Sequence, residues 1–299
     1  MEHMKQTLIL RKWVDISKCL LLGAGLLFAG CKGGGSDAGQ DGKWEDSAKL
    51  CDPAEYDLSC MKDDKTAASD GVLDVLGGIK DGVVEMAGDP VSDERQDEYG
   101  DNSRAEIERQ FPVFEEHPKQ NLLNGLLHKL LKLRRDPSDI KYNIFVVRSD
   151  MVNAFTLGGE IYVTNTLLDE AGSTDELACI IGHEIGHNEL GHVGKKLKEV
   201  EIAQGIFGDE AGEAVAGFVG LLTMGFNQKN EAESDLYGID LALAGGYDAC
   251  RGIDFWDRLK PQEGEANDFE NMFRSHPYSA RRAECYRSHL QAEHEVGCD

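Results

Sequence analysis

The chain has 299 residues, of which 41% are hydrophobic, so it is long enough for one sizeable domain with additional segments. It carries 55 acidic against 31 basic residues, for a formal net charge of −24. Such an acidic chain does not fit a nucleic-acid-binding protein or electrostatic attachment to anionic lipid, so we expect no nucleic-acid partner.

The first 30 residues have the pattern of an export signal. Basic residues from Lys5 to Lys18 precede an apolar stretch, Leu20 to Ala29, that is too short for a permanent membrane span. The stretch ends in Leu-Phe-Ala-Gly and then Cys31, which resembles a bacterial lipobox with phenylalanine where leucine is usual. We therefore predict a lipoprotein signal peptide over 1–30 and lipidation of Cys31. An ordinary secretory signal with an incidental cysteine is the alternative.

A lipid on Cys31 would hold the chain on a bacterial membrane, facing the periplasm. Lys32 after the cysteine, rather than aspartate, favours the outer membrane over the inner one. Residues 31–70, rich in glycine, serine and acidic side chains, are expected to be a flexible acidic tether. Apolar residues at helical spacing predict an accessory helix within 71–93, and the main domain is expected over 94–299.

Six cysteines remain after Cys31, an even number that favours disulfides in an oxidising compartment. Cys51 with Cys60 is the favoured local pair, and Cys250 with Cys285 could join the last two helices. Cys179 is expected to be a buried small hydrophobic residue.

The first part of the main domain mixes a helix with strands. Leucines at helical spacing over 122–131 predict an amphipathic helix, and Tyr142 to Val147 is typical of a strand. Val152 to Leu157 and Glu160 to Thr164 flank Gly158-Gly159, which predicts a β-hairpin. Further helices are expected within 196–226, from Glu231 to a glycine C-cap at Gly245-Gly246, and over 249–259 and 278–294.

The next helix carries the most informative motif, His183-Glu184-x-x-His187. Ser173 and Glu176 form a capping box at its start, and apolar residues between them and the motif indicate burial. Residues i and i+4 share one helix face, so both imidazoles can reach one metal ion. Zinc lowers the pKa of a water molecule towards neutrality, and Glu184 is placed to take its proton.

A catalytic zinc usually has three protein ligands, so a third ligand is needed. If the helix continues, His192 lies about 180° around it from His183, which disfavours it as a ligand. Glu231 and Asp235 share a face of the next helix. One can bind zinc while the other accepts the free N–H of a ligating histidine, and Glu233 is the weaker choice. A solvated acidic helix N-terminus is the alternative.

Three sequence elements, in this order, resemble the gluzincin metallopeptidases of family M48, in particular the small lipoprotein branch. They are Asn153-Ala154-Phe155 with Gly158-Gly159, the motif at 183–187, and Glu231 with Asp235. The resemblance covers roughly 94–290. It implies an α+β fold, mostly α-helical, of the zincin type, with a small β-hairpin or sheet packed on the His-Glu-x-x-His helix.

The resemblance also implies residue roles. One zinc ion per chain would be bound by His183, His187 and Glu231, with Glu184 as general base and Asp235 orienting a ligand. Asn153 and Ala154 would lie on an edge strand that pairs with extended substrate. An arginine that the family often has three residues before the ligand glutamate is replaced here by Gln228.

His276-Pro277 matches a further family motif in a loop after the Glu231 helix. His276 could cap the zinc as a fourth, latching ligand, stabilise the oxyanion, or lie away from the metal.

The expected function is a membrane-anchored zinc metalloendopeptidase acting on unfolded or misassembled envelope proteins. A thermolysin-like enzyme is the near alternative, disfavoured by the long interval between His187 and Glu231. An envelope chaperone or assembly lipoprotein, with a structural or latched zinc site, is the alternative from another class. The sequence assigns neither the oligomeric state nor a physiological substrate.

Overall fold

The computed structural model describes residues 50–61, 88–207, 226–259, 276 and 280–298. In chain order, the elements are η1 (Pro53–Glu55), η2 (Ser59–Met61), α3 (Asp93–Gln110), α4 (Gln120–Leu131), β1 (Asn143–Val147), β2 (Ala154–Leu157), β3 (Glu160–Thr164), α5 (Asn165–Glu170), α6 (Thr174–Glu189), α7 (His192–Phe207), α9 (Gln228–Ala244), α10 (Cys250–Leu259) and α12 (Ala280–His294). The expected α+β, mostly helical fold is confirmed.

The three strands form one sheet in the order β1-β3-β2, with β1 parallel and β2 antiparallel to β3. The predicted hairpin joins β2 and β3 at Gly158 and Gly159, whose φ angles of +54° and +83° favour glycine. A Cβ on Gly158 would lie 2.0 Å from the carbonyl oxygen of Gln96 on α3. The turn therefore lies directly against α3, and β2 forms one edge of the sheet.

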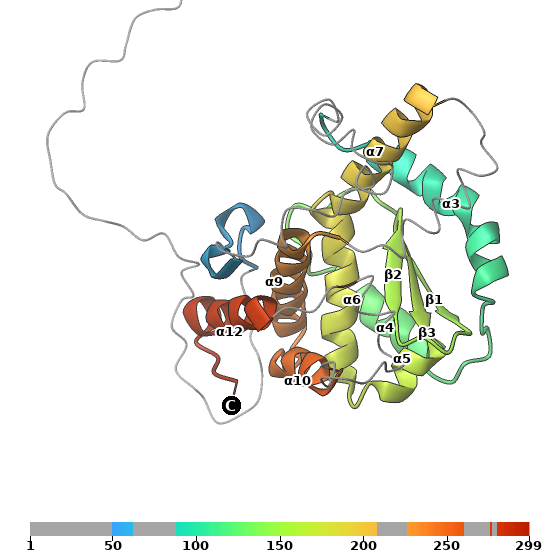
Figure 1. Cartoon of the computed structure of the whole chain (residues 1–299). Helices are drawn as coiled ribbons and strands as arrows, with labels where there is room; N and C mark the ends of the chain where they lie inside the picture. The colour runs from blue at the N-terminus through green and yellow to red at the C-terminus, as the bar shows by residue number, and fades with distance from the viewer. Residues whose placement is uncertain (1–49, 62–87, 208–225, 260–275, 277–279, 299) are drawn as a thin grey trace, which may run out of the picture. The chain divides into compact units, whose positions relative to one another are not determined.

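Helices cover both faces of this sheet (Figure 1). On one face, α4 and α6 pack against the strands through a core that includes Leu123, Leu130, Ile144, Ile161, Val163 and Ile181. On the other face, α3 and α7 pack through Ile107, Phe155, Tyr162, Val193 and Leu197. Because α6 is buried between the sheet and α9, the His-Glu-x-x-His motif lies in the interior of the domain.

Helices α6 and α9 lie side by side and approach closely at two glycines (Figure 1). A Cβ on Gly182 would lie 2.7 Å from the carbonyl oxygen of Gly238, and one on Gly238 would lie 2.6 Å from the backbone nitrogen of His183. Any larger residue there would push the helices apart. The short distance brings the motif of α6 next to the acidic residues of α9.

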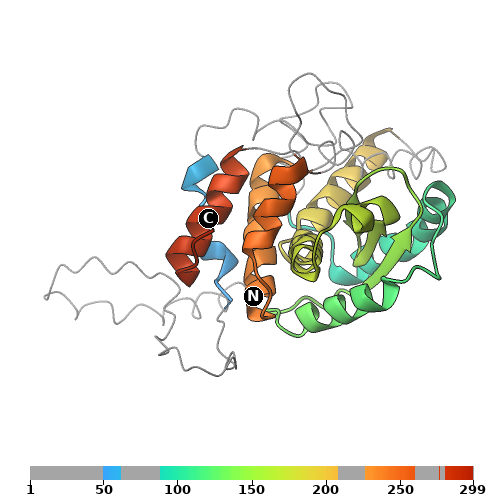
Figure 2. The same ribbon diagram turned by 90° about the horizontal axis from the view of Figure 1, so that it is seen from below.

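The C-terminal helix α12 packs on α9 and on the turns of residues 50–61 (Figure 2). Cys51 and Met61 are buried in these turns. Residues 50–61, assigned from composition to the flexible tether, thus form part of the folded domain. The composition there is polar, but its few apolar side chains reach the surface of α9 and α12.

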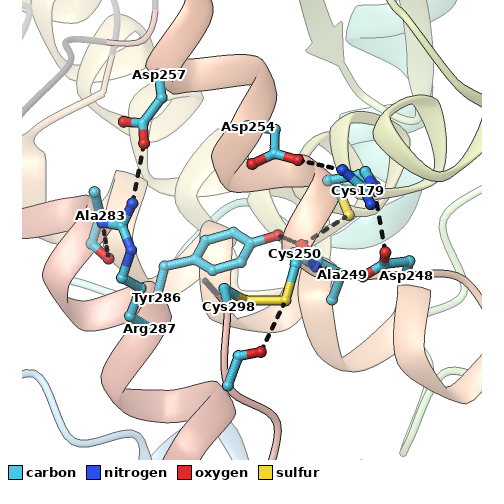
Figure 3. Close-up of a disulfide and its surroundings, with 12 residues drawn as sticks. Cys179, Asp248, Ala249, Cys250, Asp254, Asp257, Ala283, Tyr286, Arg287 and Cys298 are labelled. Atoms are coloured by element: carbon cyan, nitrogen blue, oxygen red, sulfur yellow. Dashed lines mark hydrogen bonds and ion pairs between the residues drawn. A yellow bond between two sulfur atoms is a disulfide. The ribbon is translucent and has the colours of Figure 1, made fainter.

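The predicted disulfides were wrong. Cys60 is joined to Cys285, and Cys250 to Cys298. The first bond attaches the η2 turn to α12, and the second attaches the chain end beyond α12 to the start of α10 (Figure 3). Both pairings depend on long-range packing of α12, which local spacing does not encode. Cys179 is free and buried, as expected.

Beside the Cys250–Cys298 bond, Tyr286 of α12 points toward α10 and α6 (Figure 3). Its hydroxyl donates to the carbonyl oxygen of Ala249 at 2.8 Å, and a Cβ on Gly252 would clash with it. This contact fixes the position of α12 relative to α10.

Within the described ranges, no helix is long and apolar enough to cross a membrane. The predicted signal peptide over 1–30, Cys31 and most of the predicted accessory helix lie outside the described residues.

Candidate metal centre

Two histidines of α6 and one glutamate of α9 meet in the interior. Helix α6 begins as predicted, with the Ser173 side chain accepting a hydrogen bond from the Glu176 backbone N–H. One helical turn separates His183 from His187, and their Nε2 atoms are 3.0 Å apart. The Glu231 carboxylate lies 3.5 Å from His183 Nε2 and 3.4 Å from His187 Nε2.

His276 adds a fourth donor to this cluster. Its Nδ1 lies 3.2 Å from His183 Nε2 and 3.2 Å from a Glu231 carboxylate oxygen. Its Nε2 donates to the backbone carbonyl oxygen of Ala154, on the edge strand β2, at 3.0 Å. The imidazole is 4% exposed, so it fills the space between the cluster and the edge strand.

The four donor atoms suit a tetrahedral metal ion. All lie within 4.8 Å of one another, and the measured pairs are 3.0 to 3.5 Å apart. Ligand atoms about 2.0–2.1 Å from a zinc ion at the centre of a tetrahedron are roughly 3.3 Å apart. Among the described residues, the buried Oε1 of Glu231 has no hydrogen-bond partner, although it faces His187. A cation between these atoms satisfies all of them.

The charge states of His187 and Glu231 favour metal binding. Burial holds the pKa of His187 well below its usual value despite the charge of Glu231, so the imidazole stays neutral. Burial would raise the pKa of Glu231, but His276 and Arg282 hold it well below the usual range. A neutral imidazole beside an ionised carboxylate is the form in which both residues bind metals.

Asp235 and Arg282 fix the orientation of His183. Asp235 Oδ1 lies 2.9 Å from His183 Nδ1, which leaves Nε2 directed at the cluster. Burial lowers the pKa of His183, but hydrogen bonds to Asp235 and Glu231 raise it to about 10, so a metal ion would have to displace a proton from this ring. Arg282 of α12 contacts both carboxylates: Asp235 at 2.8 and 2.9 Å and Glu231 at 3.0 Å. No sequence signal pointed to Arg282, which supplies a positive charge from α12, a helix far from the motif along the chain.

His192 and Glu233 hold His187 in a similar way. Helix α6 ends at Glu189, so His192 does not lie on the opposite face of that helix from His183, as a continued helix would have placed it. His192 instead begins α7, and its Nδ1 lies 3.2 Å from His187 Nδ1, on the side of the ring away from the cluster. His192 Nε2 lies 3.2 Å from Glu233. If His192 Nε2–H donates a hydrogen bond to Glu233, His192 Nδ1 accepts one from His187 Nδ1–H. The Nε2 lone pair of His187 then faces the cluster.

Glu184 is placed beside the cluster as a candidate proton acceptor. Its side chain is 2% exposed, and its Oε1 lies 3.4 Å from His276 Nε2. Burial raises the pKa of this carboxyl, and among the described residues its Oε2 has no hydrogen-bond partner. A largely apolar pocket adjoins Glu184 and His183, lined also by Leu167, Ile180 and Trp256.

The predicted substrate-binding residues lie at the start of β2. The carbonyl oxygen of Asn153 accepts hydrogen bonds from Thr164, so it faces the neighbouring strand β3. The carbonyl oxygen of Ala154 faces the opposite way, toward His276. At Ala154 the outer edge of β2 therefore faces His276, which in turn contacts the cluster.

Comparison with known proteins identifies the family of this site. The model of Peptidase family M48 matches residues 119–289, which is more than half of the chain and contains every proposed ligand. The chain belongs to peptidase family M48. The family is one of metallopeptidases, so it implies a divalent metal at the site, and the donor set described above fits it.

Curated relatives agree with this assignment. The chain is 31% identical to the metalloprotease LoiP of Escherichia coli over 52% of this chain and 64% of that protein. It is 28% identical to the mitochondrial metalloendopeptidase OMA1 of Schizosaccharomyces pombe, over 62% of this chain and 54% of that protein. A putative β-barrel assembly-enhancing protease of Vibrio cholerae is 26% identical to this chain, over 64% of this chain and 43% of that protein. The chain therefore spans between 43% and 64% of the length of these relatives.

Proposed function

We propose that this chain is a membrane-anchored zinc metalloendopeptidase that cleaves unfolded or misassembled proteins of the bacterial cell envelope. The observation that carries the proposal is the cluster of His183, His187 and Glu231, with the buried carboxylate of Glu184 beside it. These three residues would hold one zinc ion. When bound, zinc supplies a Lewis acid and brings the pKa of a water molecule near neutrality.

The side chains then have separate tasks. Glu184, whose pKa is raised by burial, takes a proton from the attacking water and passes it to the leaving amine. Asp235 and Arg282 hold His183 and Glu231 in place. An extended segment of substrate pairs with the outer edge of β2 at Ala154 and presents its peptide bond above the cluster. Backbone pairing suits unfolded chains, because their backbone N–H and C=O groups are free.

Location in the envelope is supported by the predicted signal peptide and lipobox at Cys31, together with two bacterial relatives. One of these relatives is named a metalloprotease and the other a putative β-barrel assembly-enhancing protease. A β-barrel assembly-enhancing protease acts, by its name, where β-barrels are assembled. We extend this to protein quality control in the envelope for the present chain.

One observation favours a second function. His276 completes a four-donor set, and four protein ligands are typical of structural zinc sites. With the fourth position closed, the chain would act mainly as a chaperone or assembly lipoprotein.

Glu184→Gln tests the peptidase function. The amide keeps the shape of the side chain but cannot accept the proton, so hydrolysis of an unfolded protein should fall about 10²–10⁴-fold while zinc stays bound. Glu116→Gln, at an exposed glutamate, is the matched control and should match the unmodified chain. Unchanged hydrolysis in Glu184→Gln, or hydrolysis that survives a zinc chelator, would contradict the zinc peptidase mechanism. No hydrolysis by the zinc-loaded, unmodified chain would favour the chaperone alternative.

A further inference from the structure

A second group of metal-ligating side chains lies further along α9, outside the proposed catalytic cluster. Asp240 Oδ1 lies 2.7 Å from His289 Nε2 and 2.7 Å from His294 Nε2, both on α12. Asp240 and His289 are 2% and 6% exposed, and the His294 side chain is 15% exposed. Two imidazoles therefore direct the same ring nitrogen at one buried carboxylate oxygen. These 2.7 Å distances are shorter than the roughly 3.3 Å between ligands of a tetrahedral zinc ion, so an ion entering here would move both rings away from Asp240.

The other oxygen of Asp240 is held by hydrogen bonds. Its Oδ2 accepts from the Tyr56 hydroxyl and from the Cys51 backbone N–H, each at 3.3 Å. Ligating carboxylates in metalloproteins are commonly oriented in this way, with outer hydrogen bonds fixing the group that binds the ion. The Cys51 sulfur is also within 4.8 Å of the other donor atoms, but it belongs to a disulfide and is not a thiolate ligand.

We propose that Asp240, His289 and His294 form a second metal site, separate from the cluster of the proposed peptidase. Two imidazole nitrogens and one carboxylate oxygen are the donors preferred by zinc and similar transition-metal ions, and not by calcium or magnesium. The partly exposed side of His294 leaves room for solvent to complete the coordination. In this arrangement both Nε2 atoms bind the ion as lone-pair donors, and each Nδ1 carries the ring proton.

The position of this site indicates what an ion there would do. It would join three parts of the chain: the turns of residues 50–61 through Tyr56, α9 through Asp240, and α12 through its two histidines. The same α12 carries Arg282, which contacts Glu231 and Asp235 in the first cluster. An ion at the second site would therefore hold α12, and with it Arg282, against α9.

The test is zinc stoichiometry in the full chain, stripped with EDTA, reloaded with zinc chloride and passed through a desalting column. We expect about two equivalents in the unmodified chain and about one in His294→Ala. His183→Ala/His187→Ala should also keep about one, and adding His294→Ala to that variant should remove it. His128→Ala, at an exposed histidine of α4, is the matched control and should keep both equivalents. Zinc should also raise the melting temperature of His183→Ala/His187→Ala, and this shift should disappear with His294→Ala.

Two outcomes overturn the proposal. The first is an unmodified chain with about one equivalent that His294→Ala leaves unchanged. The second is His183→Ala/His187→Ala protein that folds but binds no zinc, which would mean that hydrogen bonds alone hold Asp240 and its two histidines. Failure of the proposed peptidase site would give a different pattern. The unmodified chain would then bind about one equivalent of zinc, which His294→Ala would remove and His183→Ala/His187→Ala would not.

Discussion

His276 contacts both the donor cluster and the edge strand, and its two ring nitrogens have different partners. Nδ1 faces Glu231 and His183, while Nε2 donates to the Ala154 carbonyl oxygen. An imidazole in this position blocks both the fourth metal position and the backbone group with which substrate would pair. These contacts favour the latch over a role in stabilising the oxyanion.

We expect His276→Ala to raise basal hydrolysis of an unfolded protein. If the open state is about 10% populated, removing the latch raises the rate about ten-fold. A histidine that stabilised the oxyanion would instead give a fall of about 10²–10³-fold, so the sign of the change decides between the roles. His128→Ala serves as the control. An unchanged rate would show that His276 has neither role.

His192 offers a second test at the level of single residues, because it contacts His187 without belonging to the donor cluster. His192→Phe keeps an aromatic ring of similar size but loses the acceptor for His187 Nδ1, so zinc affinity should fall about 10–100-fold. Competition with a chromophoric chelator measures this. His128→Phe, at an exposed histidine of α4, is the matched control. Equal affinities in His192→Phe and the unmodified chain would contradict the positioning role.

At the scale of elements, the site depends on the close approach of α6 and α9 at Gly182 and Gly238. Glu231 and Asp235 reach His183 and His187 because no side chain separates the two backbones at this crossing. The spacing of ligands within each helix follows from the sequence. The distance between the helices follows from these glycines.

Gly238→Ala should therefore destabilise the fold and weaken zinc binding together. The added methyl group would lie 2.6 Å from the His183 nitrogen, and such overpacking typically costs about 1–3 kcal/mol. Gly125→Ala on α4 has nothing within 4 Å of the new Cβ and should gain about 0.5–1 kcal/mol. Urea unfolding at fixed zinc concentration compares the two variants. A Gly238→Ala protein as stable as the unmodified chain would show that the helices can separate without loss.

Local sequence signals predicted most of the elements but few of the contacts between them. The capping box at Ser173, the glycine pair of the hairpin and the helical spacing of histidines act within a few residues, so each could be read directly. Arg282 and the Cys60–Cys285 disulfide depend on how α12 packs, which is a long-range property. His192 was misplaced because α6 was extended past Glu189, although Gly191 (φ +72°) ends it there.

At the scale of the whole molecule, the described turns of residues 50–61 are fixed to the domain by α12. Arg281 donates to the Cys60 carbonyl oxygen next to the Cys60–Cys285 disulfide. The predicted tether of residues 31–70 is therefore wrong for residues 50–61, which pack on α9 and α12.

The predicted lipid anchor is tested by Cys31→Ser. Serine cannot accept the thioether-linked lipid, so the protein should move from the membrane fraction to the soluble fraction of the envelope, while zinc content and hydrolysis stay unchanged. Cys179→Ser is the control: it removes a free, buried thiol and should leave the protein in the membrane fraction. Several acyl chains on one residue anchor a protein firmly, whereas a single chain gives only marginal membrane binding. Because Cys31→Ser would remove all the chains at once, the released fraction should be large. Membrane partitioning that persisted in Cys31→Ser would point to another attachment and would contradict the predicted lipobox.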